Sequence, residues 1–142
     1  MTQQPSLDPR LIEASYALQE HLGFEVTAWQ DGVAVIEVPL APILMNRQGI
    51  PHGGVHATLM DTAMGFAGCY TGDPDRRRMA LTLSMTVNYL AQAKGTRFIA
   101  TGQVTGGGHK TYFAEARVED EHGTLIATGS GVFRYRSEAS TA

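Results

Sequence analysis

The stretch that decides the fold runs from residue 53 to residue 71 and reads GGVHATLMDTAMGFAGCYT. On a helical projection its apolar residues fall on nearly every side, namely Val55, Ala57, Leu59, Met60, Ala63, Met64, Phe66 and Ala67. A helix that is hydrophobic all round is normally buried inside a protein. The small residues between the large ones would let a sheet pack closely against it. The stretch therefore predicts a long central helix enclosed by a sheet.

The residues that follow have the pattern of β-strands. Residues 81–89 alternate between apolar and polar side chains, which is the period of a strand. Three more strands are expected at about 96–105, 111–120 and 124–135, separated by short glycine-containing segments. Strands joined by short turns pair antiparallel, so these four strands are expected to form a meander.

Two strands are also expected before the central helix. They span residues 24–30 and 33–39 and flank Asp31-Gly32, a dipeptide typical of β-hairpin turns. Pro39 and Pro42 end regular strand pairing, so residues 40–52 are interpreted as a connection.

The N-terminal region predicts a short amphipathic helix over residues 9–22. Asp8 is its expected N-cap, Pro9 suits the first turn, and Gly23 is a stop signal. Residues 1–7 and 137–142 are expected to be frayed ends.

These elements together predict an α+β fold, in which one antiparallel sheet wraps one long helix in a single domain over residues 1–142. With 43% hydrophobic residues the chain can bury a core without disulfides. Its single cysteine, Cys69, and the absence of a signal-like N-terminus favour the cytoplasm. A net charge of −3 without a basic stripe gives no reason to expect nucleic acid, and no apolar run is long enough to predict a membrane span.

Two features of the central helix indicate chemistry. Asp61 lies mid-helix among apolar residues, where an ionised carboxylate costs several kcal/mol unless it is paired. It is either a structural Asp bonded to a neighbour or a functional group. Gly53 and Gly54 open the helix, where free N–H groups can hold an anion or a developing oxyanion. The alternative is that these glycines only make a tight turn.

The spacing of these features suggests a shared site. Gly53 and Asp61 are eight residues apart, which is about 12 Å along one helix. One helix does not easily bring both to one reacting carbon, whereas two antiparallel helices do. We therefore expect a two-fold homodimer with two equivalent sites at the subunit interface.

The sequence also resembles a known family. The matching residues are Asn46, the turn His52-Gly53-Gly54, Leu59, Asp61 and, later, Asn88-Tyr89-Leu90. Over about residues 20–135 they resemble the hotdog-fold acyl-CoA thioesterases of the phenylacetic-acid-degradation type. One departure is Gln92, where the family often has proline.

The resemblance implies hydrolysis of a small, medium or aromatic acyl-CoA. It implies Asp61 as general base or nucleophile, Gly53 and Gly54 as donors to the thioester carbonyl, and Thr82 beside Asp61. It implies His52 and Asn46 as polar partners of substrate or water. The expected substrate-binding residues are Arg47, Tyr89, His109 and Lys110. No metal and no cofactor is expected, CoA being part of the substrate, and dimers are expected to pair into a dimer of dimers.

Two other functions stay open. A hotdog dehydratase or hydratase would pair a histidine, for which His52 is the candidate, with a carboxylate. A non-catalytic acyl-CoA binding module would not need the buried carboxylate. Other residues have simpler interpretations: His56 as a satisfied core histidine, Cys69 as a small buried hydrophobe, and Arg76 to Arg78 as a solvated turn.

Overall fold

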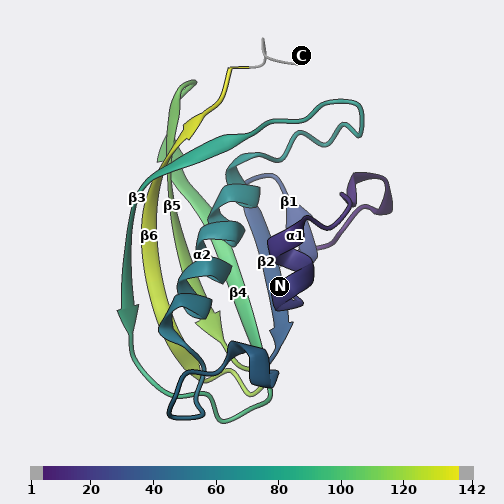
Figure 1. Ribbon diagram of the computed structural model, residues 1–142. Coiled ribbons are helices and arrows are strands. Elements are labelled where there is room, and N and C mark those ends of the chain that lie inside the picture. The colour runs from purple at the N-terminus through teal and green to yellow at the C-terminus, as the bar shows by residue number, and fades with distance from the viewer. Residues whose placement is uncertain (1–4, 138–142) are drawn as a thin grey trace.

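The computed structural model describes residues 5–137, in which one six-stranded antiparallel sheet curves around the helix α2 (Figure 1). Helix α2 spans Gly53–Gly68. The strands are β1 (Glu25–Gln30), β2 (Val33–Pro39), β3 (Ala80–Tyr89), β4 (Arg97–Gly107), β5 (Thr111–Glu119) and β6 (Leu125–Tyr135). Their order in the sheet is β1-β2-β4-β5-β6-β3. The α+β prediction of an antiparallel sheet around one long helix is confirmed.

The predicted four-strand meander is only partly correct. Strands β4, β5 and β6 are consecutive neighbours, but β3 pairs with β6 at the edge of the sheet and not with β4. The β3–β4 connection instead crosses the end of the sheet. Buried Asp120 fixes it there, accepting from the backbone N–H groups of Lys94 at 2.8 Å and Gly95 at 3.0 Å. A short connection in the sequence does not reveal whether it turns back or crosses.

One face of α2 fills the hollow of the sheet. Leu59, Met60, Ala63 and Met64 are almost fully buried in the main core. The helix and sheet approach so closely at Gly102 of β4 that a Cβ there would lie 2.5 Å from the Ala63 carbonyl carbon. Core packing at this point therefore requires glycine.

The other face of α2 is not covered by the sheet. Asp61, Thr62, Gly65 and Phe66 are all half-buried in the single chain. The prediction that the helix is enclosed on every side is therefore wrong for this chain alone. The apolar composition of this segment did not reveal the open face of the helix, because small and aromatic residues also occur on partly open surfaces.

The predicted helix over 9–22 is interrupted. A 3-10 turn, η1 (Pro9–Leu11), is followed by extended residues and then by α1 (Ala17–Leu22). Asp8 accepts from the Arg10 N–H as a cap, but Ile12 already has extended backbone angles. Leu11 is buried while Leu18 is 50% exposed, so the two do not form one stripe. The stop at Gly23 is confirmed by its left-handed backbone.

The expected frayed ends lie mostly outside the described residues, namely 1–4 and 138–142. Residues 5–7 are held, contrary to the prediction. The Ser6 carbonyl accepts from the Trp29 N–H at 2.9 Å, and Leu7 packs with Leu11 and Trp29. A polar sequence with prolines gave no signal of this pairing.

The hairpin between β1 and β2 turns at Asp31-Gly32 as predicted, with Gly32 at φ 76°. η2 (Pro42–Leu44) then leads into the loop before α2. Within residues 5–137, no helix is both long enough and apolar enough to cross a bilayer.

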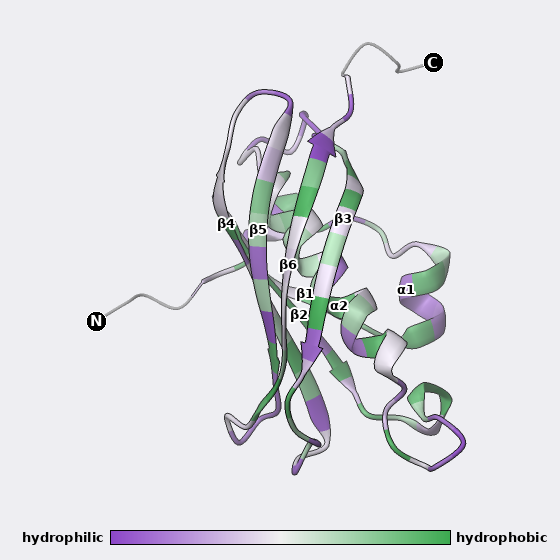
Figure 2. Ribbon diagram, turned by 90° about the vertical axis from the view of Figure 1, so that its left-hand side faces the viewer, coloured by the Kyte–Doolittle hydropathy of each residue, from purple (hydrophilic) through white to green (hydrophobic). Residues whose placement is uncertain are grey.

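Hydrophobic residues recur along the edge strand β3 (Figure 2), and the sheet leaves several of their side chains exposed. Leu81 is 55% exposed and Leu83 is 57% exposed, and Met79, Tyr89 and Leu90 are similar. The predicted alternation of β3 is present, but Leu81 and Leu83 are open in the single chain, whereas Met85 and Val87 are half-buried against the core.

Candidate active site

Asp61 and Thr82 form the centre of the site. They are 21 positions apart in the chain, and the Thr82 hydroxyl donates to Asp61 Oδ1 at 2.6 Å. Asp61 comes from the open face of α2, and Thr82 from β3. A β-bulge between Thr82 and Ser84 shifts the register there. Bulges often redirect a side chain beside a functional site. The structure thus brings together two predicted site residues from separate elements.

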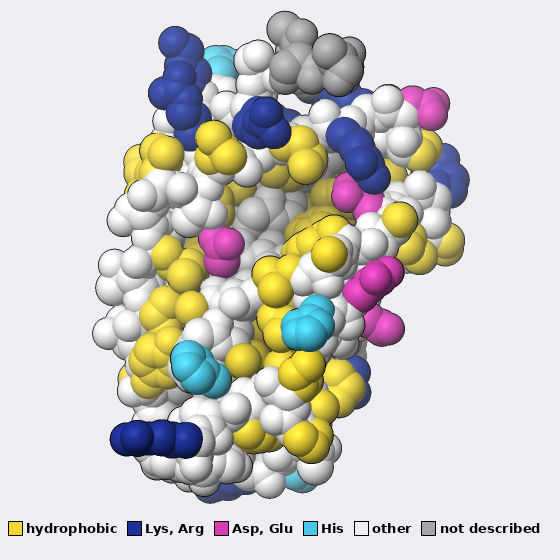
Figure 3. Space-filling model, viewed as in Figure 1, with side chains coloured by type: hydrophobic (Ala, Val, Ile, Leu, Met, Phe, Trp, Pro, Cys, Tyr) yellow, Lys and Arg dark blue, Asp and Glu magenta, His cyan; other side chains and the backbone are white. Residues whose placement is uncertain are grey.

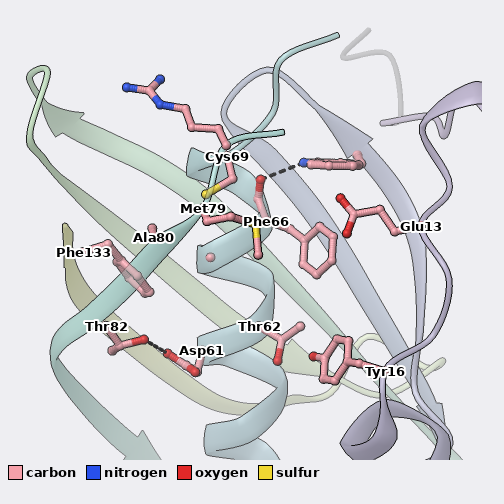
Figure 4. Close-up of a pocket in the computed structure, with 13 residues that line it drawn as sticks. Glu13, Tyr16, Asp61, Thr62, Phe66, Cys69, Met79, Ala80, Thr82 and Phe133 are labelled. Atoms are coloured by element: carbon pink, nitrogen blue, oxygen red, sulfur yellow. Dashed lines mark hydrogen bonds between the residues drawn. The ribbon is translucent and has the colours of Figure 1, made fainter. Parts of the chain in front are cut away.

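A cavity of about 250 Å³ opens beside this pair, and Asp61 and Thr82 both line it (Figure 4). The Asp61 carboxylate is therefore not sealed in the core. The walls of the cavity are mostly apolar and include Trp29, Gly65, Phe66, Met79, Ala80 and Phe133. The arrangement places a carboxylate at the edge of a space that a small organic group can enter.

The N-terminal segment forms one wall of this cavity. Glu13 and Tyr16 line it, and Figure 4 shows the Tyr16 hydroxyl facing Thr62 of α2. Burial raises the pKa of Tyr16, opposed by its bond to Thr62, and the charge of Asp61 adds to the rise. The sequence did not indicate Glu13 or Tyr16, because both were placed on a continuous helix that the structure breaks.

Cys69 also lines the cavity. Burial raises the pKa of its thiol to about 11, which keeps it protonated at neutral pH. It is half-buried, in keeping with its interpretation as a small hydrophobe.

A second cluster lies at the N-terminus of α2. His52 is the N-cap residue, and its Nδ1 accepts from the Gly54 N–H at 2.9 Å. The Gly54 donor is therefore occupied in the single chain. The Gly53 N–H has no partner among residues 5–137. One free donor thus remains at the positive end of the helix dipole.

Tyr89 lies across the start of α2. Its hydroxyl donates to the Gly53 carbonyl at 2.5 Å, and a Cβ on Gly53 would lie 3.3 Å from that hydroxyl. Its ring packs edge-on against His56, which is buried. Burial lowers the pKa of His56, opposed by bonds to the His52 and Gly53 backbone. His56 is thus the satisfied core histidine that the sequence indicated.

Asn46 shapes the loop that leads into α2. Its side-chain oxygen accepts from the backbone N–H of Gln48 at 2.8 Å and of Ile50 at 3.4 Å. Its position in this loop brings it to the same end of α2 as Gly53. Arg47, beside it, is exposed.

His109 and Lys110 lie at the opposite end of the sheet. They form the turn between β4 and β5, far from the start of α2 (Figure 1). Lys and Arg side chains gather at this end of the molecule in Figure 3, above a hollow in the surface. A single chain therefore does not join these residues to the Gly53 cluster.

Asp61 and Gly53 are likewise separate within one chain. Both lie on α2, eight residues apart, which is a rise of about 12 Å. In the part of the chain that the structure describes, no three His, Cys, Asp or Glu side chains are grouped closely enough to hold a metal ion.

A family model described as the thioesterase superfamily matches residues 48–127. This range contains α2, β3, β4 and β5, and so includes Gly53, Asp61 and Thr82.

Curated and solved proteins agree with that match. The medium/long-chain acyl-CoA thioesterase of Escherichia coli is 26% identical over 79% of this chain and 81% of its own length. The structure of a conserved protein from Pseudomonas aeruginosa has a TM-score of 0.77 and 31% identity, covering 89% of this chain and 97% of that one. The E. coli PaaI protein from the phenylacetic acid degradation operon has the same fold, with a TM-score of 0.73 and 20% identity over 84% of each chain.

Proposed function

This chain belongs to the thioesterase superfamily, has the hotdog fold and is a thioester hydrolase, and we propose that its substrate is an acyl-CoA carrying a small, medium or aromatic acyl group. We further propose that Asp61 is its catalytic carboxylate. The observation that carries the proposal is the position of Asp61. Its carboxylate is held at 2.6 Å by the Thr82 hydroxyl and opens onto a cavity. A purely structural aspartate would need no adjoining space.

The N-terminus of α2 supplies the second half of the proposed mechanism. The free N–H of Gly53 and the helix dipole polarise the thioester carbonyl and stabilise its developing negative charge. His52 acts here by capping the helix through Gly54, which fixes the backbone around that donor. Tyr89 braces the same turn through the Gly53 carbonyl.

In the proposed hydrolysis, Asp61 acts either on a water molecule or directly on the thioester carbonyl carbon. Asp61 takes a proton from water as the water oxygen attacks the carbonyl carbon, and collapse of the intermediate breaks the C–S bond and releases CoA thiolate. Direct attack by Asp61 would instead form an anhydride that water later opens. Label found in Asp61 after a single turnover in ¹⁸O-labelled water identifies the anhydride route, because only attack of water on the aspartyl carbonyl of the anhydride puts the label there.

The separation of Gly53 and Asp61 supports a site shared by two chains. In a two-fold homodimer, Gly53 of one chain faces Asp61 of the other. The exposed apolar residues of edge strand β3, such as Leu81 and Leu83, offer a surface for such pairing. Two such dimers are proposed to associate into a tetramer.

Coexpression tests the shared site directly. Gly53→Pro removes the donor and Asp61→Asn removes the carboxylate, so each homodimer should be inactive. A mixed dimer should regain one intact site, made from Gly53 of one chain and Asp61 of the other. Absence of rescue in purified mixed dimers would mean that one chain provides both groups.

The remaining polar residues are proposed to contact the rest of the substrate. Among residues 5–137 only the side-chain oxygen of Asn46 is used by the loop, and we propose that its amide NH₂ binds substrate or water. Arg47, Tyr89, His109 and Lys110 are proposed to contact the CoA portion, with no metal and no separate cofactor.

The position of His52 weighs against a dehydratase or hydratase. Its Nδ1 accepts from the Gly54 N–H, so the ring is held at the start of α2 as the N-cap of the helix. A non-catalytic acyl-CoA binding module would leave the Asp61–Thr82 pair without a role.

Thiol release from a panel of acyl-CoAs tests the function. We expect Asp61→Ala and Asp61→Asn to lower turnover by about 10²-fold or more with the fold intact. Glu115→Gln, on the outer face of β5, is the matched control for loss of one carboxylate and should keep wild-type turnover. Turnover in the Asp61 variants equal to that of the wild type would show that Asp61 has no part in the mechanism. Tight CoA binding without hydrolysis by the wild type would indicate a binding module.

A further inference from the structure

The cavity beside Asp61 follows one stripe of α2. Asp61, Thr62, Gly65, Phe66 and Cys69 all line it, and their spacing places them on one side of the helix. The space therefore begins at the carboxylate and continues toward the C-terminal end of α2. A group attached to the reacting carbon would lie along this stripe.

Gly65 opens the middle of that stripe. It is one helical turn after Asp61, and a Cβ built on it would meet nothing within 4 Å. This contrasts with Gly68 and Gly102, where a Cβ would collide with Tyr112 and with the α2 backbone. A glycine inside a helix costs about 0.5–1 kcal/mol relative to alanine. Packing within the chain does not require glycine at 65, and the open space is its structural consequence.

The N-terminal segment forms one wall of the cavity. Glu13 and Tyr16 form that wall, with the Tyr16 ring edge-on to Phe24 at a centroid distance of 6.0 Å. A Glu13–Arg77 ion pair, 3.5 Å between Oε1 and Nη2, ties this segment to the loop before β3. These contacts hold that wall in place.

The volume indicates the size of that occupant. A dry apolar cavity of about 150 Å³ accommodates benzene. The space here, about 250 Å³, has room for one aromatic ring with a short linker, or for a short branched chain. Its walls are mostly apolar, with Glu13 and Arg78 as charged lining residues besides Asp61, so the greater part of the space suits a group without charge.

We propose that this cavity is the acyl pocket, that Gly65 is its specificity-determining residue, and that the substrates are compact acyl groups of about one aromatic ring. The inference rests on the proposed thioesterase function and adds the substrate class to it. Any side chain at 65 occupies space next to Asp61 that the acyl group needs.

The test is a graded series, Gly65→Ala, Gly65→Val and Gly65→Leu, assayed with acetyl-CoA, phenylacetyl-CoA and palmitoyl-CoA. The measured quantity is the ratio of kcat/KM for phenylacetyl-CoA to that for acetyl-CoA. We expect the wild type to favour phenylacetyl-CoA over both others. We expect the ratio to fall with each added carbon group, by about 10-fold or more at leucine. Circular dichroism and Tm check folding.

The outcomes separate the two proposals. An unchanged ratio across the folded variants, or a wild type that prefers palmitoyl-CoA, overturns the assignment of Gly65 and the cavity while the thioesterase function stands. A wild type that releases thiol from none of these three and from no other acyl-CoA of the panel contradicts the proposed function as well as the acyl pocket, whereas silence toward these three alone overturns only the acyl pocket. If the leucine variant does not fold, the alanine and valine variants decide the matter, because a Cβ at 65 meets no neighbour.

Discussion

Replacing Gly53 with proline removes one hydrogen-bond donor with little other change. Gly53 is the first residue of α2, a position where proline is favoured because no intrahelical bond needs its N–H. The residue before a proline must be extended, and His52 already has φ −63° and ψ 136°. The Cβ would lie 3.3 Å from the Tyr89 hydroxyl, the far end of an exposed side chain that can move slightly. The fold should therefore tolerate the substitution.

The expected effect is on the chemical step. Loss of one oxyanion donor typically lowers kcat by about 10²–10³-fold. Gly53→Pro should show this loss in thiol release from an acyl-CoA, at saturating substrate, with Tm equal to or above that of the wild type. Ala17→Pro is the matched control, since Ala17 is the first residue of α1 and Tyr16 before it is also extended.

Two results would refute the reasoning. Turnover of Gly53→Pro within about threefold of the wild type would show that the Gly53 N–H does not stabilise the transition state. A similar loss in Ala17→Pro would show that the effect comes from proline at a helix start rather than from the missing donor.

Three further predictions follow from single contacts. Thr82→Val should lower kcat about 10-fold, which corresponds to the lower end of the free energy of a hydrogen bond to a charged group, and Thr82→Ser should restore kcat. A kcat of Thr82→Val equal to that of the wild type would show that the hydroxyl has no role. Gly102→Ala should lower the free energy of unfolding in urea by about 1–3 kcal/mol, because its Cβ would overlap the Ala63 backbone, whereas Gly65→Ala should not. Burial lowers the pKa of His56 in the folded state, so below about pH 6.5 the unfolded chain binds more protons than the folded chain. The free energy of unfolding should therefore fall as the pH falls through that region. His56→Gln should flatten this pH dependence in urea titrations from about pH 7.5 to 5.

Local patterns predicted the elements of the fold well. The period of two gave β3 as residues 81–89 where the structure has Ala80–Tyr89, and Asp31-Gly32 gave the first hairpin. The central helix was predicted from its start at Gly53, although it ends at Gly68 rather than at residue 71. These signals are carried by neighbouring residues, so they survive without knowledge of the rest of the molecule.

The candidate site was predicted in its residues but not in its grouping. Asp61 and Thr82 do lie together, because β3 reaches the edge of the sheet beside the open face of α2. The far wall of the cavity, Glu13 and Tyr16, was missed, because the break after Leu11 depends on packing against Trp29 and not on the local pattern.

By itself, the sequence determined the six strands, that one helix is central, and that a carboxylate and a glycine turn lie on it. Those properties follow from hydrophobic period, turn residues and spacing, which act over a few positions. Only the tertiary structure decided that β3 pairs with β6, that Asp61 meets Thr82, and that α2 keeps an open face with a cavity at Gly65. Those depend on contacts between residues far apart in the chain, whose geometry is fixed only when the whole sheet closes around the helix.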